Sequence, residues 1–298
     1  MRILVAADSL GLPRPHRINN YSPNETDLAI YYENTYSSII NKELLNYYKM
    51  DPYIEVINRS RRFQTIKNVN DEFADHLFFY EPDVIMMHVG IVDCWFRENL
   101  EGKQMVDRKN YQQYFLNILE LLKNRPSCKL VIVGIAPTSI KMQKRYPGIN
   151  REIRLYNQVL KSSVDNKTVF YIDMEKHVDP HRTQKYLLPD DSHLNQEGNK
   201  LVAEQAISLF KGFIYADLGV QQYNEGNHEG ALKYFERSYD AYPLELNNIY
   251  NLMVIYFGNQ QMDKLNRLIG YVKIHEIDDM DILNIVEVVE AGENLTEG

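Results

Sequence analysis

The chain has 298 residues, of which 44% are hydrophobic and 25% are charged, and its formal net charge is −8. These proportions are typical of a globular protein with a core, and they exclude a wholly disordered or collagen-like chain. The apolar run at residues 3–7 is too short for a signal peptide, and no run approaches the roughly 18 residues of a membrane span. We therefore expect a soluble, cytoplasmic protein with no membrane span.

Short apolar runs rich in β-branched residues alternate with segments of helical periodicity. The apolar runs predict buried strands at residues 2–7, 53–57, 83–89, 129–135 and 168–172. The helical segments lie at residues 31–49, 71–79, 109–123, 151–163 and 196–209. This alternation predicts an α/β fold, a three-layer α/β/α sandwich around a five-stranded parallel sheet. Ligands of such sheets bind beyond the carboxyl ends of the strands.

The end of the chain differs from the rest in charge and in pattern. From residue 213 onward acidic residues outnumber basic ones, which argues against nucleic acid as a partner. Small, aromatic and helix-stopping residues there match the period of about 34 residues of a tetratricopeptide unit: Gly219, Gly226, Ala231, Phe235, Ser238 and Pro243. A degenerate second repeat and a capping helix at residues 280–289 are expected to follow. The predicted domains are residues 1–212 and a small all-α domain, residues 213–298.

Stacked helical repeats present concave surfaces that bind proteins. The all-α domain is therefore interpreted as a docking surface for a protein partner or for a second copy of the chain. The alternative is a cap that only stabilises the α/β domain.

Metal and disulfide chemistry find little support in the sequence. Cys94 and Cys128 are isolated thiols, typical of a reducing compartment and without the spacing of a zinc site. His177 and His181 flank Asp179, but no third ligand accompanies them. We therefore expect no metal and no cofactor.

Two segments carry residues suited to nucleophilic catalysis. Ser9 follows the first predicted strand, where its hydroxyl can project from the sheet edge as a nucleophile or simply cap the next helix. Asp190 precedes His193 by three residues, so its carboxylate can bond one ring nitrogen and leave the other to act as a base. The alternative for Asp190 is a cap of the turn before the helix at Gln196.

The parallel topology brings both segments to one sheet edge, where Ser9, His193 and Asp190 can form a triad of nucleophile, general base and orienting acid. On these residues the chain up to about residue 212 resembles the SGNH or GDSL hydrolases. Their first block, usually Gly-Asp-Ser, reads Ala-Asp-Ser at residues 7–9, and their last block reads Asp-Asp-Ser-His at residues 190–193. The resemblance implies a serine esterase on a flavodoxin-like sandwich.

The middle blocks depart from the family pattern. The resemblance implies an oxyanion hole made of the nucleophile's amide, a second-block glycine amide and a third-block asparagine side chain. These positions hold Ser9, Ser60 and Val92 here. Ser9 and Ser60 still offer amides, but Val92 offers no side-chain donor, and the loss of one donor lowers the rate on the order of 10²- to 10³-fold. The candidates for a replacement donor are Arg59, Arg61, His88 and Arg97.

Cationic and aromatic side chains follow several of the predicted strands. Arg59, Arg61 and Arg62 suggest attraction of an anionic group such as a uronate or a sugar phosphate, or else a solvated rim without a ligand. Trp95 is expected to form a sugar-stacking wall or to anchor its loop, and Asp93 to hydrogen-bond the loop that carries Ser9 or Ser60. The expected substrate-binding residues are Asn58, Arg59, Arg61, His88, Asp93, Trp95 and Arg97.

The sequence therefore favours an esterase that removes or transfers a small O-acyl group, most simply acetyl, on a carbohydrate or another small ester. The form Gly-Ile-Val-Asp-Cys at residues 90–94 also resembles a subgroup of these hydrolases that accompanies bacterial surface-polysaccharide synthesis. The alternative is a catalytically weak or inactive module that binds a glycan or a protein and recruits partners through its helical repeats. Val92 supports the alternative, whereas the intact triad supports the enzyme.

Overall fold

The computed structural model describes residues 1–14, 30–47 and 53–296. It divides into two compact units, Met1–Ile207 and Ser208–Gly298, whereas the sequence pattern puts the division after residue 212. The boundary falls inside helix α7, Gln196–Asn224, so the prediction that this helix ends at residue 209 is wrong. The helix continues through Gly219, where the Phe235 ring lies 2.5 Å from the place of a Cβ atom and leaves no room for a larger side chain.

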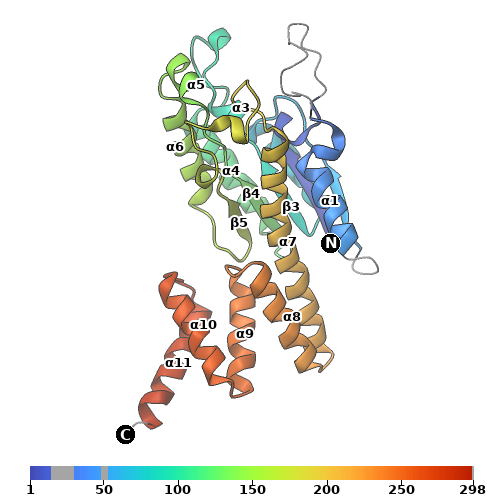
Figure 1. Cartoon of the computed structure of the whole chain (residues 1–298), viewed down its shortest axis with the longest axis vertical. Helices are drawn as coiled ribbons and strands as arrows, with labels where there is room; N and C mark the ends of the chain where they lie inside the picture. The colour runs from blue at the N-terminus through green and yellow to red at the C-terminus, as the bar shows by residue number, and fades with distance from the viewer. Residues whose placement is uncertain (15–29, 48–52, 297–298) are drawn as a thin grey trace. The chain divides into compact units, whose positions relative to one another are not determined.

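A five-stranded parallel sheet with the order β2-β1-β3-β4-β5 forms the centre of the first unit (Figure 1). The strands are β1 Arg2–Ala7, β2 Glu55–Asn58, β3 Val84–His88, β4 Lys129–Val133 and β5 Val169–Ile172. Each overlaps one of the predicted apolar runs. The predicted fold class, an α/β protein with a flavodoxin-like parallel sheet followed by helices, is confirmed.

Helices cover this sheet. Before α7 they are α1 Tyr36–Tyr47, α2 Ile66–Phe78, α3 Ile91–Cys94, α4 Arg108–Leu122, α5 Ile140–Arg145 and α6 Ile149–Lys161. The 3₁₀ turns are η1 Ser9–Gly11, η2 Tyr32–Asn34, η3 Glu98–Leu100, η4 Met174–Lys176 and η5 Thr183–Lys185. Helices α2, α4 and α6 share one apolar cluster with the sheet, in which Phe73, Phe115 and Tyr156 pack with Leu4 and Ile85.

The buried side chains of α1 and α7 lie outside that cluster. Successive strand residues point to opposite faces, so the neighbours of Leu4 face the other side of the sheet. Figure 1 shows α1 and the first turns of α7 next to each other along the sheet, and the amide of Tyr36 donates to Asn199 Oδ1 at 3.0 Å. Because helices cover both faces of the sheet, a ligand can reach it at the carboxyl ends of the strands.

Helix α2 begins at Ile66, earlier than the sequence pattern predicts. Thr65 caps it: the Thr65 side chain accepts from the Asn68 amide, and Asn68 Oδ1 accepts from the Thr65 amide at 3.0 Å. A polar cap of this kind can start a helix before its first apolar repeat. The early start fixes the chain that leads from β2 past Ser60.

The second unit contains only helices. After α7 they are α8 His228–Ala241, α9 Leu246–Gly258, α10 Met262–Ile274 and α11 Met280–Thr296. Their apolar side chains share one cluster, which includes Ala231 and Phe235. The tetratricopeptide assignment and the docking role stay predictions. Within the described ranges, no helix combines the length and the apolar content that a membrane span requires.

Candidate active site

Ser9 lies in a tight turn at the carboxyl end of β1. Asp8 fixes this turn, since its Oδ1 atom accepts from the Leu10 amide at 2.8 Å and its own amide donates to the His88 carbonyl at 3.2 Å. Ser9 is half-buried and begins the 3₁₀ turn η1. The turn therefore presents the Ser9 hydroxyl at the sheet edge.

His193 and Asp190 lie in the loop that precedes α7, and this loop is closed by its own hydrogen bonds. The Leu188 amide donates to the His193 carbonyl at 2.7 Å. Asp190 Oδ1 accepts from the amides of Ser192, at 3.2 Å, and His193, at 3.0 Å. Thr138, after β4, donates its hydroxyl to the Asp191 carbonyl at 2.7 Å, which ties the loop to the sheet edge. The carboxylate is thereby held beside the imidazole.

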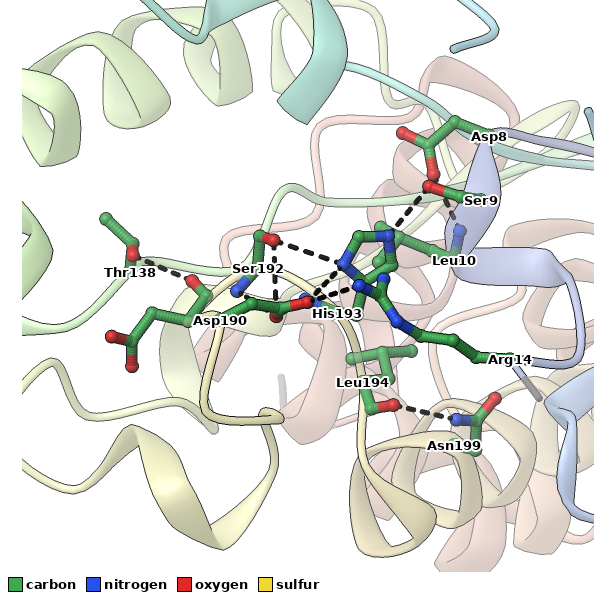
Figure 2. A network of polar contacts seen from close by, with 11 residues as sticks. Asp8, Ser9, Leu10, Arg14, Thr138, Asp190, Ser192, His193, Leu194 and Asn199 are labelled. Atoms are coloured by element: carbon green, nitrogen blue, oxygen red, sulfur yellow. Dashed lines mark hydrogen bonds and ion pairs between the residues drawn. The ribbon is translucent and has the colours of Figure 1, made fainter. Parts of the chain in front are cut away.

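Figure 2 shows the three predicted catalytic side chains in one continuous chain of contacts. Ser9 Oγ is 2.8 Å from His193 Nε2, across 184 positions of sequence. His193 Nδ1 is 2.9 Å from Asp190 Oδ2. When Asp190 accepts a hydrogen bond from the N–H group at Nδ1, Nε2 has a free lone pair facing the hydroxyl. This arrangement can remove the proton of Ser9 as its oxygen attacks a carbonyl carbon.

Arg14 adds a contact that the sequence reasoning missed. Its guanidinium lies 2.8 Å from Asp190 Oδ2, the same oxygen that faces His193 (Figure 2). Burial raises the pKa of Asp190, but the hydrogen bond and charge of His193, the His193 amide and Arg14 outweigh burial and hold this pKa well below its usual range. Asp190 is therefore ionised at neutral pH. A cation a few residues after Ser9 is the signal that could have pointed to Arg14.

The donors for an oxyanion differ from the expected set. The Ser60 amide donates to Asn58 Oδ1 at 2.9 Å, so it is already occupied, and the predicted role of Ser60 conflicts with this geometry. The Ser9 amide has no acceptor within the described ranges. Val92 is buried, and its side chain has no donor. Of the two predicted backbone donors, the Ser9 amide is therefore free to bind an oxyanion and the Ser60 amide is not.

Four of the predicted substrate-binding residues lie outside the cavity beside Ser9: three have other partners, and His88 is buried. Asn58 donates to the Gly11 carbonyl at 2.9 Å and to Ser37 Oγ at 3.1 Å. Arg59 stacks over Tyr80, with Cζ 5.3 Å from the ring centre. The Arg61 guanidinium pairs with Glu72 at 2.6 Å. His88 is buried, and burial lowers its pKa to about 3, so it is neutral. We therefore correct their assignment: none of these four lines the cavity beside Ser9.

That cavity has a volume of about 640 Å³, and Ser9 and His193 form part of its wall. Of the predicted binding residues, Trp95 and Arg97 lie in its wall. The complete lining is Ser9, Leu10, Leu12, Pro13, Arg14, Arg62, Phe63, Ile91, Val92, Trp95, Arg97, Ser192 and His193. Within the described part of the chain, no cluster of His, Cys, Asp and Glu side chains could hold a metal ion.

Asp93 is fully buried rather than in the cavity wall, which corrects its assignment to substrate binding. Its Oδ1 atom accepts from the amide of Ile66, at the start of α2, at 2.9 Å, rather than from the loop that carries Ser9 or Ser60. Burial raises the pKa of Asp93 to about 8, an effect strengthened by the nearby Asp8, whose own pKa burial raises to about 7. Both carboxyls therefore hold a proton over much of the neutral range.

Asp93→Asn is expected to stabilise the protein at alkaline pH. A carboxyl with a raised folded-state pKa binds its proton more tightly when folded, so the free energy of unfolding falls as pH rises from about 4 to about 8. The substitution removes this loss and should raise the free energy of unfolding near pH 8 by on the order of 2 kcal/mol, with no gain below about pH 4. Urea denaturation over this pH range measures the difference.

Asp107→Asn is the matched control for that experiment. Asp107 is exposed, and hydrogen bonds led by the Asn110 amide at the start of α4 hold its pKa below the usual value. Its charge stabilises the fold above the unfolded-state pKa, so its removal should lower stability at alkaline pH. A gain from Asp93→Asn that does not change with pH would contradict the assignment.

Comparison with known proteins supplies the family. The model of the GDSL-like Lipase/Acylhydrolase family matches residues 25–201, more than half of the chain. The chain belongs to this family. The residues matched to the GDSL-like hydrolases include Asp190 and His193, and Ser9 lies before them. No curated protein matches the sequence.

Solved structures of other hydrolases share the fold of this GDSL-like protein. An alpha/beta hydrolase enzyme from the metagenome of Lake Arreo, Spain, is 15% identical with a TM-score of 0.51, and the match covers 68% of this chain and 91% of that chain. The lipase/acylhydrolase from Enterococcus faecalis is 14% identical with a TM-score of 0.50, and the match covers 70% and 94%. These likenesses show the fold of the first unit.

Proposed function

We propose that the protein is a serine esterase that removes a small O-acyl group, most simply acetyl, from a carbohydrate. The observation that carries this proposal is the chain of contacts from Ser9 through His193 to Asp190, 2.8 Å and 2.9 Å long, at the wall of a cavity. Membership of a family of lipases and acylhydrolases supports ester cleavage. Phe63 and Trp95 in the cavity wall offer flat apolar surfaces suited to a sugar ring.

In the proposed reaction His193 Nε2 accepts the Ser9 proton while Ser9 Oγ attacks the ester carbonyl. The Ser9 amide donates to the developing oxyanion. His193 then gives the proton to the leaving sugar oxygen, and the acyl group stays on Ser9. Water activated by His193 releases it as a carboxylic acid. A sugar hydroxyl in place of water makes the same steps an acyl transfer.

The proposal extends to the setting of the reaction. We place it in the cytoplasm, on an acylated precursor of a bacterial surface polysaccharide. The support is the form of the block at residues 90–94 for the polysaccharide, and the isolated thiols of Cys94 and Cys128, typical of a reducing compartment, for the cytoplasm.

A second candidate is a weak or inactive module that binds a glycan or a protein, with the C-terminal helices binding a partner or a second copy. Two observations favour it: the Ser60 amide already donates to Asn58, and Val92 has no side-chain donor. A site with a single backbone donor is expected to be slower by on the order of 10²- to 10³-fold than one with an added donor.

Labelling with a fluorophosphonate separates the two candidates. The reagent forms a bond from Ser9 Oγ to phosphorus and expels fluoride, while the Ser9 proton passes to His193. We expect peptide mass spectrometry to find the adduct on Ser9 and no adduct in the Ser9→Ala protein. A folded wild-type protein that takes no label and hydrolyses no p-nitrophenyl acetate would favour the binding module.

A further inference from the structure

The cavity beside Ser9 combines three arginines with no carboxylate. Within the described ranges its wall contains Arg14, Arg62 and Arg97 but neither aspartate nor glutamate. Arg14 forms an ion pair with Asp190, whose Oδ2 atom is 2.8 Å from the guanidinium group. Arginine stays charged at any physiological pH. The cavity therefore retains the charges of Arg62 and Arg97.

Neither of these two guanidinium groups has a carboxylate partner within ion-pair distance in the described part of the chain. Arg62 lies over the ring of Phe63, with Cζ 5.9 Å from the ring centre. Arg97 donates to the Val92 carbonyl at 3.3 Å, and its Nε atom is buried without an acceptor. Asp93 attracts Arg97, but it is protonated at neutral pH because burial raises its pKa to about 8. Both cations are thus available to an anion that enters the cavity.

The segment that carries Arg62 is held in a strained conformation. Phe63 has φ 57°, the left-handed region that bulky side chains rarely adopt, and its ring is 59% exposed. Such strain amounts to on the order of 1–3 kcal/mol and persists where the surrounding structure fixes it, often at ligand sites. Here it places an aromatic ring and a guanidinium together in the cavity wall. Trp95 and Arg97 lie in the wall of the same cavity.

We infer that the natural ester carries an anionic group, a carboxylate or a phosphate, which Arg62 and Arg97 bind while the acyl carbonyl reaches Ser9. This inference rests on the proposed esterase function and names its substrate class: an acylated acidic sugar rather than a neutral one. Guanidinium groups bind carboxylates and phosphates through paired hydrogen bonds, so one cavity can accept either anion. The neighbouring aromatic rings hold the sugar ring between the anion and the triad.

The test compares three acetyl esters on the full-length protein: an O-acetylated methyl glucuronoside, an O-acetylated glucose 6-phosphate and an O-acetylated methyl glucoside. We expect kcat/KM for at least one anionic ester to exceed that for the neutral ester by roughly 10- to 100-fold. This is the gain in affinity that a charge-assisted hydrogen bond typically gives. The anion that gains more distinguishes a carboxylate from a phosphate substrate. The preference should weaken with added salt.

Variants then assign the preference to residues. The double variant Arg62→Gln, Arg97→Gln should bring the ratio of anionic to neutral kcat/KM to within about threefold of one. Arg61→Gln is the matched control, since Arg61 is adjacent to Arg62 but its charge is paired with Glu72 at 2.6 Å outside the cavity. It should keep the wild-type ratio. Equal rates for charged and neutral esters in the wild type, or a ratio that survives in the double variant, would overturn the inference.

Binding separates this inference from the esterase proposal. Calorimetry with the acetylated glucuronoside and the acetylated sugar phosphate on Ser9→Ala protein measures affinity without turnover. Affinity for the anionic ester that falls at least about tenfold when Arg62 and Arg97 are also replaced supports the anion site, even if the wild type hydrolyses nothing. Equal affinity for anionic and neutral esters refutes it. Failure of Ser9 labelling refutes only the esterase.

Discussion

Ser9→Ala is expected to lower kcat for p-nitrophenyl acetate by about 10³-fold or more. The reason is geometric: Ser9 Oγ is 2.8 Å from His193 Nε2, the nitrogen that faces away from Asp190. Without this hydroxyl no acyl-enzyme can form, and only slow direct attack by water on the bound ester is left. The measurement is steady-state hydrolysis, with circular dichroism to confirm that the variant is folded.

Ser192→Ala is the matched control, because Ser192 is a second hydroxyl beside the same imidazole. Its Oγ atom is 3.2 Å from His193 Nδ1, on the side of Asp190. It can help to orient the ring, but it is not at the nitrogen that acts as the base. We expect its loss to lower kcat by no more than about tenfold. If Ser192→Ala removed activity while Ser9→Ala kept it, the assignment of the nucleophile would be wrong.

The second large effect is expected for Asp190→Asn, which should lower kcat by about 10³- to 10⁴-fold and change KM by less than about threefold. Asp190 Oδ2 lies 2.9 Å from Nδ1 and favours the ring form whose Nε2 is free to accept a proton. An amide can donate to Nδ1 instead, which moves the ring proton to Nε2 and blocks proton transfer from Ser9. Since the pKa of Asp190 is lowered, mild acidification should leave its role intact.

Asp191→Asn controls for the loop itself. Asp191 is adjacent to Asp190, but its Oδ1 atom accepts from the Thr183 hydroxyl at 3.1 Å, away from the imidazole. Its backbone has φ 57°, which asparagine tolerates well. We expect kcat to change by less than about threefold. Equal losses for both variants would mean that the loop needs its negative charge rather than an oriented histidine.

The sheet and the convergence of Ser9, His193 and Asp190 could be predicted because both depend on simple patterns. Buried parallel strands appear as continuous apolar runs, and parallel topology puts the residues after each strand at one edge. No distance was needed to expect residue 9 near residue 193. The same reasoning places Trp95 and Arg97 by the cavity because they follow β3 closely.

The loop after β2 could not be predicted as well, because neighbouring side chains point in different directions in irregular backbone. Arg59 stacks on Tyr80, Arg61 pairs with Glu72, and Arg62 alone among these three lines the cavity. Residue type does not distinguish them. The Ser60 amide had a visible signal, since an asparagine two residues earlier commonly accepts from that amide in a turn.

The continuity of α7 changes how the chain should be divided for expression. A truncation after Gly212 cuts through this helix, which runs from Gln196 to Asn224. It also removes Phe213 and Ile214, which are 1% and 2% exposed. Losing such side chains from a core lowers stability by several kcal/mol each, roughly 2–5. If such a fragment were insoluble, the cause would be the broken helix rather than the loss of the C-terminal helices. A shortened protein should therefore keep the whole of α7.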